Sequence, residues 1–489
     1  MKRDPSSFRD PDGFVYRRDG IVHRQIHASY AEDYDQLVAS GLLESLIGDG
    51  LLIPHEEVGL DQAATGEAVR VLRPEPVGFI SYPYEWCFSQ LKDAALLTLQ
   101  IQEQALDRGM CLKDASAFNV QFHQGRPIFI DTLSFARRIP GTGWAAYHQF
   151  CRHFLAPLAL MVHHDAGLAG LLRVHLDGVS LPLASSLLPA RTWLNFSKLV
   201  HLHLHARSVV NFSDDSAPPS VADAAVSPGS NPDKSPAPGS RPATGRRLGG
   251  MSDAAIHGLV DSLRGAVGGL VLPRRGTVWR DYYQNTNYKP ESMSSKESLV
   301  EAFIGATDAK IVWDLGANTG RFSRIASRRG LQSVALEADP EAVEACYLEL
   351  RSAKETRVLP LVMDLMNPSP NQGWAGEERA SLEARGPTDL ILALALIHHL
   401  CIGNNVPFDH LARFLGRLTR WLILEFVPHG DSQVDRMLRI RNLTFDHYNR
   451  ENFEAAFMAE FECRRSDPIP GTKRTLYLFE RRTPAVGES

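Results

Sequence analysis

The chain has 489 residues, of which 44% are hydrophobic and 22% are charged, as expected for a soluble globular protein with material for more than one core. Its formal net charge of -5 excludes a global positive field that would attract nucleic acid or an anionic membrane. No apolar run reaches the length of a membrane span, and the six cysteines stand singly, without a Cys-x-x-Cys pair. We therefore expect a cytoplasmic protein with reduced thiols and two or three domains.

The first part of the chain, residues 1–210, carries the mixed strand and helix patterns of an α+β domain. The stretch GFVYRRDGIVHRQI predicts a β-hairpin that turns at Asp19-Gly20, and AVRVLRPEPVGFISYPYEW predicts further strands. The stretch FSQLKDAALLTLQIQEQALDRG has the apolar spacing of an amphipathic helix and ends in a glycine that stops it.

A chemical motif follows in LKDASAFNVQFHQGRPIFIDTLSF, where Asp114 and Asn119 fit D-x-x-x-x-N and Asp131 comes one strand later. The pattern resembles the catalytic loop and metal-binding acid of protein-kinase-like and aminoglycoside-phosphotransferase-like folds. The resemblance implies Asp114 as a base and Asn119 and Asp131 as magnesium ligands. No Gly-rich phosphate loop precedes the motif, and Leu112-Lys113 and Thr132-Leu133 replace the usual His-Arg and Phe-Gly. We therefore expect a degenerate kinase-like domain.

Residues 211–255 form a boundary. Most of this segment, SDDSAPPSVADAAVSPGSNPDKSPAPGSRPATGRRLGG, is rich in Pro, Ser, Ala and Gly and has almost no large apolar side chains. Such a composition cannot bury enough surface to offset the entropy lost on ordering. We predict a disordered linker here and a second domain at residues 256–489.

Apolar runs alternate with helical patterns after the linker. The strand-like runs are KIVWDLG, SVALEAD, RVLPLVMDL, TDLILALALI and RWLILEFV, and Asp339-Pro340 marks the start of one helix between them. Continuous Val, Ile and Leu runs of this kind are typical of buried parallel strands, so we predict a doubly wound α/β sheet. FECRRSDPIPGTKRTLYLFERR predicts an antiparallel hairpin at its edge.

Glycines and acids stand where these strands end, and in open α/β sheets ligands lie at the carboxyl ends of the strands. Gly316 and Gly320 let the backbone approach a ligand closely, and Asp314 ends the first strand just before them. Glu337 ends the second strand, where a carboxylate can accept hydrogen bonds from a ribose diol. Asp364 follows the third strand, within reach of an adenine amino group.

The run D-x-G-x-N-x-G at residues 314–320 distinguishes two kinds of nucleotide site. A dinucleotide-binding dehydrogenase uses G-x-G-x-x-G, whose third glycine allows close helix packing. Here Arg321 and Phe322 follow Gly320, so the dinucleotide spacing fails. An acid before the glycines suits a ligand with an amino or cationic group better than a pyrophosphate.

Residues 279–482 resemble a class I S-adenosylmethionine-dependent methyltransferase, on DLGANTG, LEADP, MDL and DLILALALIHHL in this order. The resemblance implies a Rossmann-like seven-stranded sheet with an antiparallel terminal hairpin and S-adenosylmethionine as the cofactor. The cofactor-binding residues that it implies are Asp314, Gly316 and Gly320 for the methionine portion, Asn318 in the same turn, Glu337 for the ribose, Asp364 for the adenine, Ala393 and Leu394 nearby, and Trp279, Tyr283 and Tyr288 as lid aromatics.

Methyl transfer asks little covalent chemistry of a protein, because the sulfonium methyl is already activated and the enzyme mainly aligns the acceptor and excludes water. A base helps when the acceptor is a hydroxyl or an ammonium group. The candidate catalytic residues are His398 and His399, just after the fourth strand, and Glu425, at the end of the fifth.

The sequence thus predicts a methyltransferase that acts on a small molecule or a glycan-type metabolite, because no basic and aromatic channel for RNA is visible. Two alternatives stay open: a phosphotransferase that works through the first half, and a non-catalytic protein that binds S-adenosylmethionine. The missing third glycine disfavours a nicotinamide-dependent oxidoreductase. A kinase-like half followed by a methyltransferase half is similar to the NoeA-like group of bacterial proteins.

Overall fold

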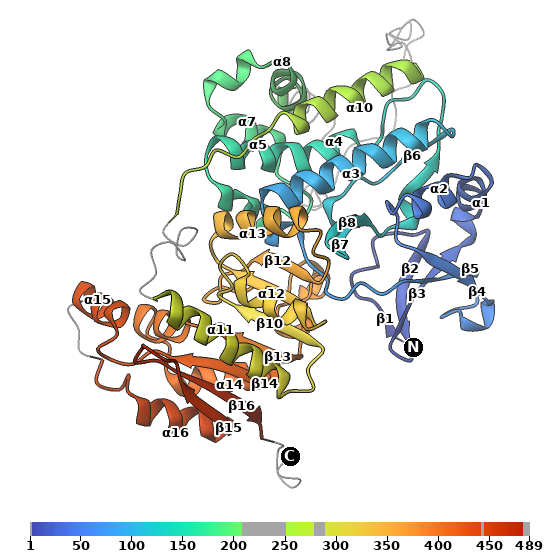
Figure 1. Cartoon of the computed structure of the whole chain (residues 1–489). Coiled ribbons are helices and arrows are strands. Elements are labelled where there is room, and N and C mark those ends of the chain that lie inside the picture. The colour runs from blue at the N-terminus through green and yellow to red at the C-terminus, as the bar shows by residue number, and fades with distance from the viewer. Residues whose placement is uncertain (1, 208–250, 278–288, 442–444, 483–489) are drawn as a thin grey trace, which may run out of the picture.

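The computed structural model describes residues 2–207, 251–277, 289–441 and 445–482 (Figure 1). The three predicted lid aromatics, Trp279, Tyr283 and Tyr288, lie outside the described residues. None of the helices in these ranges has the length and apolar character that crossing a bilayer requires.

The first half begins with a five-stranded antiparallel sheet in the order β1-β2-β3-β5-β4. The predicted hairpin at Asp19-Gly20 is confirmed, with φ angles of 53° and 80° that suit a tight turn between β2 and β3. The elements of this region are β1 Lys2–Arg3, β2 Gly13–Arg18, β3 Ile21–His27, α1 Ala31–Ala39, α2 Leu42–Gly48, β4 His55–Val58 and β5 Ala68–Pro74.

Helix α3 (Phe88–Leu106) is the predicted amphipathic helix, and the chain turns after it at Gly109, where φ is 70°. Two short two-stranded sheets lie beside it and frame the D-x-x-x-x-N loop. The rest of the first half is mainly helical. The elements are β6 Met110–Leu112, β7 Val120–His123, β8 Arg126–Phe129, β9 Phe135–Arg137, α4 Tyr147–Phe150, α5 Ala156–His163, α6 Leu171–Val174, α7 Leu181–Leu187 and α8 Phe196–Lys198.

Helix α10 (Asp253–Gly268) packs along α3 (Figure 1). Arg264 Nη2 lies 2.6 Å from Glu103 Oε2 on α3. Two expectations therefore change. Residues 251–255, expected in the disordered linker, include the start of α10 and a bridge from Met251 to Gly141. This helix, assigned to residues 256–489, lies instead on the first half, because its apolar face is buried there: Ile256, Val260, Leu263 and Val267.

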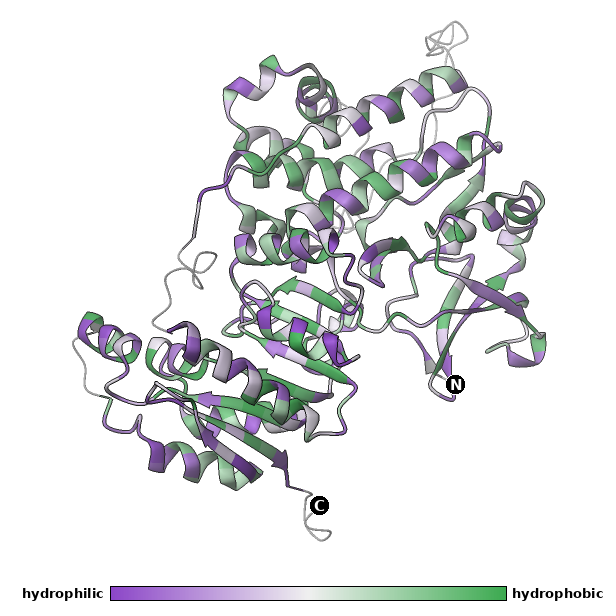
Figure 2. Cartoon of the chain, viewed as in Figure 1, coloured by the Kyte–Doolittle hydropathy of each residue, from purple (hydrophilic) through white to green (hydrophobic). Residues whose placement is uncertain are grey.

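The second half contains the predicted seven-stranded sheet, in the order β12-β11-β10-β13-β14-β16-β15. Strands β10 to β14 run parallel, and β16 is antiparallel to both β14 and β15, so the expected terminal hairpin is confirmed. Apolar residues concentrate on the central strands (Figure 2). The strands are β10 Ile311–Leu315, β11 Gln332–Glu337, β12 Val358–Val362, β13 Thr388–Ala393, β14 Thr419–Phe426, β15 Phe461–Pro468 and β16 Thr475–Arg481.

Helices cover both faces of this sheet. Helices α11 (Pro290–Gly305) and α12 (Arg321–Arg328) bury one face, and α14 (Phe408–Leu418) and α16 (Arg450–Glu460) bury the other. Helix α13 (Pro340–Ser352) begins at the predicted N-cap, since the Asp339 carboxylate accepts a hydrogen bond from Glu341 N at 2.8 Å. Helix α15 (Ser432–Arg441) follows β14.

The first half supplies part of the cover. Residues 363–387, all of them described, connect β12 to β13 through 3-10 turns and contain no α-helix. Phe79 of the first half packs edge-on against Trp313 of β10, with ring centroids 5.7 Å apart. Gln90 Nε2 donates to the carbonyl oxygen of Pro360 at 3.0 Å, beside the outer strand β12. The two halves therefore share one continuous core.

Candidate functional site

The glycine turn between β10 and α12 lies at the carboxyl edge of the sheet. Its backbone is left-handed at Gly316, Asn318 and Gly320, with φ angles of 70°, 53° and 73°. A Cβ on Gly320 would lie 2.6 Å from Cys346 Sγ, and one on Gly316 would lie 3.1 Å from Leu396 Cδ1. Glycine alone combines this backbone with such close neighbours, so the turn can bring backbone N–H groups near a ligand.

Asp314 is the next-to-last residue of β10, just before the turn, and is 2% exposed. Its Oδ2 accepts a hydrogen bond of 2.6 Å from the Ser323 hydroxyl. Burial raises the pKa of Asp314 to about 7, against the lowering effects of the Ser323 hydrogen bonds and of the Lys296 charge. A buried carboxylate that is costly to ionise favours a cationic ligand group as its partner.

Glu337 ends β11 and faces the same turn. Its Oε2 accepts a hydrogen bond from Asn318 N at 2.9 Å, and its Oε1 accepts one from Asp339 N at 3.0 Å. Burial raises the pKa of Glu337, and the backbone hydrogen bonds oppose that rise. Each oxygen of an ionised carboxylate has a second lone pair, so Glu337 can hold the turn in place and still accept hydrogen bonds from a diol.

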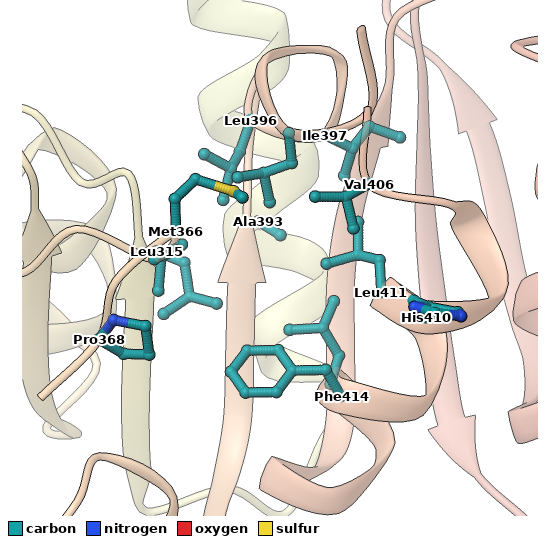
Figure 3. A pocket seen from close by; sticks show the side chains of 13 residues that line it. Leu315, Met366, Pro368, Ala393, Leu396, Ile397, Val406, His410, Leu411 and Phe414 are labelled. Carbon is teal, nitrogen blue, oxygen red and sulfur yellow. The ribbon is translucent and has the colours of Figure 1, made fainter. Parts of the chain in front are cut away.

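An apolar cavity of about 160 Å³ lies beside these strand ends (Figure 3). Ala393 and Leu315 form one wall, and Leu365 and Met366, directly after Asp364, form another. Asp364 itself is exposed, and its Oδ1 accepts a hydrogen bond from Met366 N at 2.9 Å. Leu394, the neighbour of Ala393, points to the opposite face of the sheet and packs with the cluster under α11 and α12. Of the two predicted residues, only Ala393 lines the cavity.

The two candidate histidines follow β13 after a left-handed residue, Ala395, with a φ of 51°. Their ring centroids are 4.1 Å apart, and His398 is 2% exposed. Burial, then the charges of His399 and two nearby cations, lowers the pKa of His398 well below its usual range, and burial lowers that of His399 to about 4. Both rings are therefore neutral at pH 7. Within the described part of the chain, His398 Nδ1 has no hydrogen-bond partner.

Glu425, the third candidate, is fully buried at the end of β14 and holds two cations. Its Oε2 lies 2.5 Å from Lys296 Nζ, and its Oε1 lies 3.1 Å from Arg474 Nη1. Arg474 Nε also lies 2.8 Å from Asp431 Oδ2. Four segments of the chain thus meet in one buried ionic cluster. A carboxylate committed to two cations is a structural anion more than a proton acceptor.

The motif residues of the first half also converge. Asn119 Nδ2 donates to Ser134 Oγ at 3.1 Å, and Ser134 Oγ donates to Asp131. Asp131 forms an ion pair with Arg24 of β3. Burial raises the pKa of Asp114, whose Oδ1 accepts a hydrogen bond from Ser116 N at 2.8 Å. Among the residues that the structure describes, no group of three or more His, Cys, Asp or Glu side chains is placed to hold a metal ion.

No family model matches the chain. The nodulation protein NoeA of Rhizobium meliloti (strain 1021) is 34% identical to it over 492 residues, which cover 98% of this chain and 96% of that protein. The chain belongs to the NoeA family. The similarity includes both halves, so it is a similarity of the whole two-part chain.

Solved methyltransferase structures also resemble parts of this NoeA-family chain. Magnesium protoporphyrin IX methyltransferase (ChlM) from Synechocystis PCC 6803, with bound SAH, matches 42% of this chain and 92% of its own at 14% identity and a TM-score of 0.31. N-methyltransferase NodS from Bradyrhizobium japonicum WM9 matches 40% of this chain and 99% of its own, at 10% identity and a TM-score of 0.29. The bifunctional kinase-methyltransferase WbdD matches 42% of this chain and 42% of its own, at 16% identity and a TM-score of 0.29.

Two residues of the ionic cluster, Lys296 and Arg474, were not predicted from the sequence. Lys296 carried a usable signal, because it stands on the apolar stripe of α11 between Met293 and Val300, where a charge requires a partner. Arg474 carried none, since a basic residue beside a Pro/Gly turn is ordinary. Both partners, Glu425 and Asp431, are distant in the sequence, so only the fold brings them together.

Proposed function

We propose that the chain transfers a methyl group from S-adenosylmethionine to an acceptor, at the carboxyl edge of the C-terminal sheet. The observation that carries the proposal is the position of two acids at one glycine turn: Asp314 precedes it and accepts a hydrogen bond from Ser323 just after it, and Glu337 binds its backbone at Asn318 N. This combination offers an anion for the ammonium of the methionine portion and hydrogen-bond acceptors for a ribose. The seven-stranded sheet with its antiparallel terminal hairpin supports the proposal.

The residues around the turn fit the rest of the cofactor. The apolar cavity has the character of a site for a flat ring, and the exposed carboxylate of Asp364, directly before the lining residue Leu365, offers a partner for an amino group. Bound S-adenosylmethionine supplies an activated methyl group. The contribution of the protein is to fix the donor against the glycine turn and to keep water away. The burial of Ala393 and His398 favours the exclusion of water.

His398 is the residue that we assign to accept a hydrogen bond from a hydroxyl acceptor. Its ring is neutral and buried, and Nδ1 lacks a partner among the described residues. A buried ring nitrogen without a partner gains a hydrogen bond when a hydroxyl enters, which aligns that hydroxyl for reaction. His399 packs against this ring at a tilt, with 41° between the two ring planes. We propose a small molecule or a glycan-type metabolite with a free hydroxyl as the acceptor.

Calorimetric titration tests the proposal directly. S-adenosylmethionine and S-adenosylhomocysteine should bind the full chain, NAD should not, and Asp314→Ala and Glu337→Ala should each weaken binding by about tenfold or more. Asp409→Asn, at an exposed carboxylate on α14 that pairs with Arg413, is the matched control and should bind normally. Failure of both adenosyl ligands to bind would remove the proposal. Binding without turnover on any acceptor would favour a non-catalytic S-adenosylmethionine-binding protein.

A phosphotransferase in the first half is the second candidate, and the clustering of Asp114, Asn119 and Asp131 favours it. The ion pair between Arg24 and Asp131 opposes it, because a magnesium ion would compete with the guanidinium for the same carboxylate. Under this candidate, Mg-ATP binds the full chain and Asp131→Ala abolishes that binding. Absence of Mg-ATP binding to the unaltered chain would assign the cluster a structural role.

A further inference from the structure

Lys296 places a buried positive charge beside the glycine turn. Its side chain is 3% exposed, and Nζ lies 2.5 Å from Glu425 Oε2 and 4.8 Å from the ring centroid of Phe322. Phe322 stands in the first turn of α12, two residues after Gly320. The ammonium group therefore lies between the end of β14 and the start of α12, next to the glycine turn.

The charge of Lys296 reaches Asp314 as well. It is among the causes that lower the pKa of Asp314. Arg474 is also committed to Asp431. Lys296 is the cation of the cluster that contacts Phe322, directly after the glycine turn. The turn has an anion, Asp314, and a cation, Lys296, in the same buried region.

This pair matches the chemistry of an α-amino acid. The methionine portion of S-adenosylmethionine carries an ammonium and a carboxylate on one carbon, and burying both requires a partner of opposite charge for each. We propose that Lys296 Nζ binds the carboxylate of the donor, while Asp314 faces its ammonium. The inference rests on the proposed function and adds a donor-binding residue to it.

Lys296 can bind the donor without giving up Glu425. A lysine ammonium has three N–H donors, so one can stay on Glu425 while another turns to a ligand carboxylate. The contact would form in a region from which water is largely excluded, where a charge-assisted hydrogen bond is stronger than at a surface. A purely structural lysine would pair with Glu425 in the same way, so the test must separate the two roles.

The test compares two ligands that differ in the amino-acid portion. S-adenosylhomocysteine carries it, and 5′-methylthioadenosine lacks it. Both dissociation constants are measured by calorimetry on the full chain, for the unaltered protein and for Lys296→Met/Glu425→Gln, which removes the cation without leaving a buried carboxylate unpaired. We expect the dissociation constant of S-adenosylhomocysteine to rise about tenfold or more, and that of 5′-methylthioadenosine to change less than about twofold.

Arg474→Met/Glu425→Gln is the matched control, because it removes the other cation of the same cluster. It should change both dissociation constants by similar factors. Lys296→Arg, which keeps the charge, should restore much of the selectivity for S-adenosylhomocysteine. The inference would be overturned if Lys296→Met/Glu425→Gln weakened the binding of both ligands by the same factor, or if the two double variants had the same ratio of dissociation constants. Either result would leave the proposed function standing. If neither ligand bound the unaltered chain, the proposed function would fail, and the inference with it.

Discussion

Arg385 of the C-terminal half and Glu85 of the N-terminal half form a buried ion pair, with 2.6 Å between Nη2 and Oε1 and side chains 5% and 1% exposed. The guanidinium also lies over the rings of Phe79 and Tyr82, 4.9 and 5.0 Å from their centroids. Ser369, in the connection between β12 and β13, donates to the same carboxylate at 2.6 Å. The pair therefore joins the two halves where the sheet lacks a covering helix.

Removing one partner of this pair should destabilise both halves together. We expect Glu85→Gln to lower the free energy of unfolding by about 3 kcal/mol, because it leaves the Arg385 charge buried without its counter-ion. Thermal unfolding followed by circular dichroism should show one transition at a lower Tm. Asp409→Asn breaks an exposed pair on α14 and should leave the Tm nearly unchanged. Two separate transitions in the unaltered chain would contradict a shared core.

Donor binding should strengthen as the pH rises through 7. In the free chain burial raises the pKa of Asp314 from 3.8 to about 7, and only the ionised carboxylate can balance the ammonium of the donor. The affinity for S-adenosylhomocysteine should therefore rise roughly eightfold between pH 6.0 and 7.5. Calorimetry at several pH values measures this rise. Asp314→Asn should abolish this rise. Burial also raises the pKa of Glu337, and Glu337→Gln shows how much of the pH dependence comes from that group.

The same shift makes a prediction for stability without ligand. Because the pKa of Asp314 is higher in the folded chain than in the unfolded chain, folding takes up a proton between about pH 4 and pH 7. The contribution of Asp314 to the free energy of unfolding therefore falls as the pH rises across this window. Denaturant unfolding of Asp314→Asn should lack this component. An identical pH dependence in both chains would show that Asp314 is not the group responsible.

His398 should matter for turnover and not for donor affinity. His398→Phe keeps a buried ring but removes the hydrogen-bond acceptor that aligns the hydroxyl, so kcat for a hydroxyl acceptor should fall by about tenfold or more. The dissociation constant of S-adenosylhomocysteine should stay within about twofold of its unaltered value. His399→Phe is the companion variant, and its effect on kcat should be smaller. A loss of donor binding in His398→Phe would assign this ring to the donor site.

Gly320 should tolerate no side chain. Gly320→Ala places a Cβ 2.6 Å from Cys346 Sγ on a backbone with φ of 73°, so it adds a steric clash to the cost of a left-handed residue. Gly330→Ala is the control, because φ is 88° but nothing lies within 4 Å of its Cβ. We expect about 1 kcal/mol of destabilisation for Gly330→Ala and distinctly more for Gly320→Ala. Equal Tm values would contradict the close approach of α13 to the turn.

The sequence by itself determined the local structure that each segment could form. The apolar runs around Asp314, Glu337 and Glu425 are buried strands, Asp339 caps the helix after β11, and the Asp19-Gly20 turn forms as predicted. These features depend on neighbours in the chain, so periodicity and turn chemistry were sufficient. The order of acids and glycines at the strand ends was readable for the same reason, because parallel strands bring their carboxyl ends to one edge.

Only the tertiary structure decided which distant residues meet. It joined Lys296 and Arg474 to Glu425, paired Arg24 with Asp131, and placed α10 on α3 although residues 107–252 separate them in sequence. It also used residues of the first half, Phe79 among them, to cover the sheet. Each of these outcomes pairs groups far apart in the chain to satisfy a buried charge or an exposed apolar face. Local patterns show that a partner is needed, and the packing of the whole chain selects the partner.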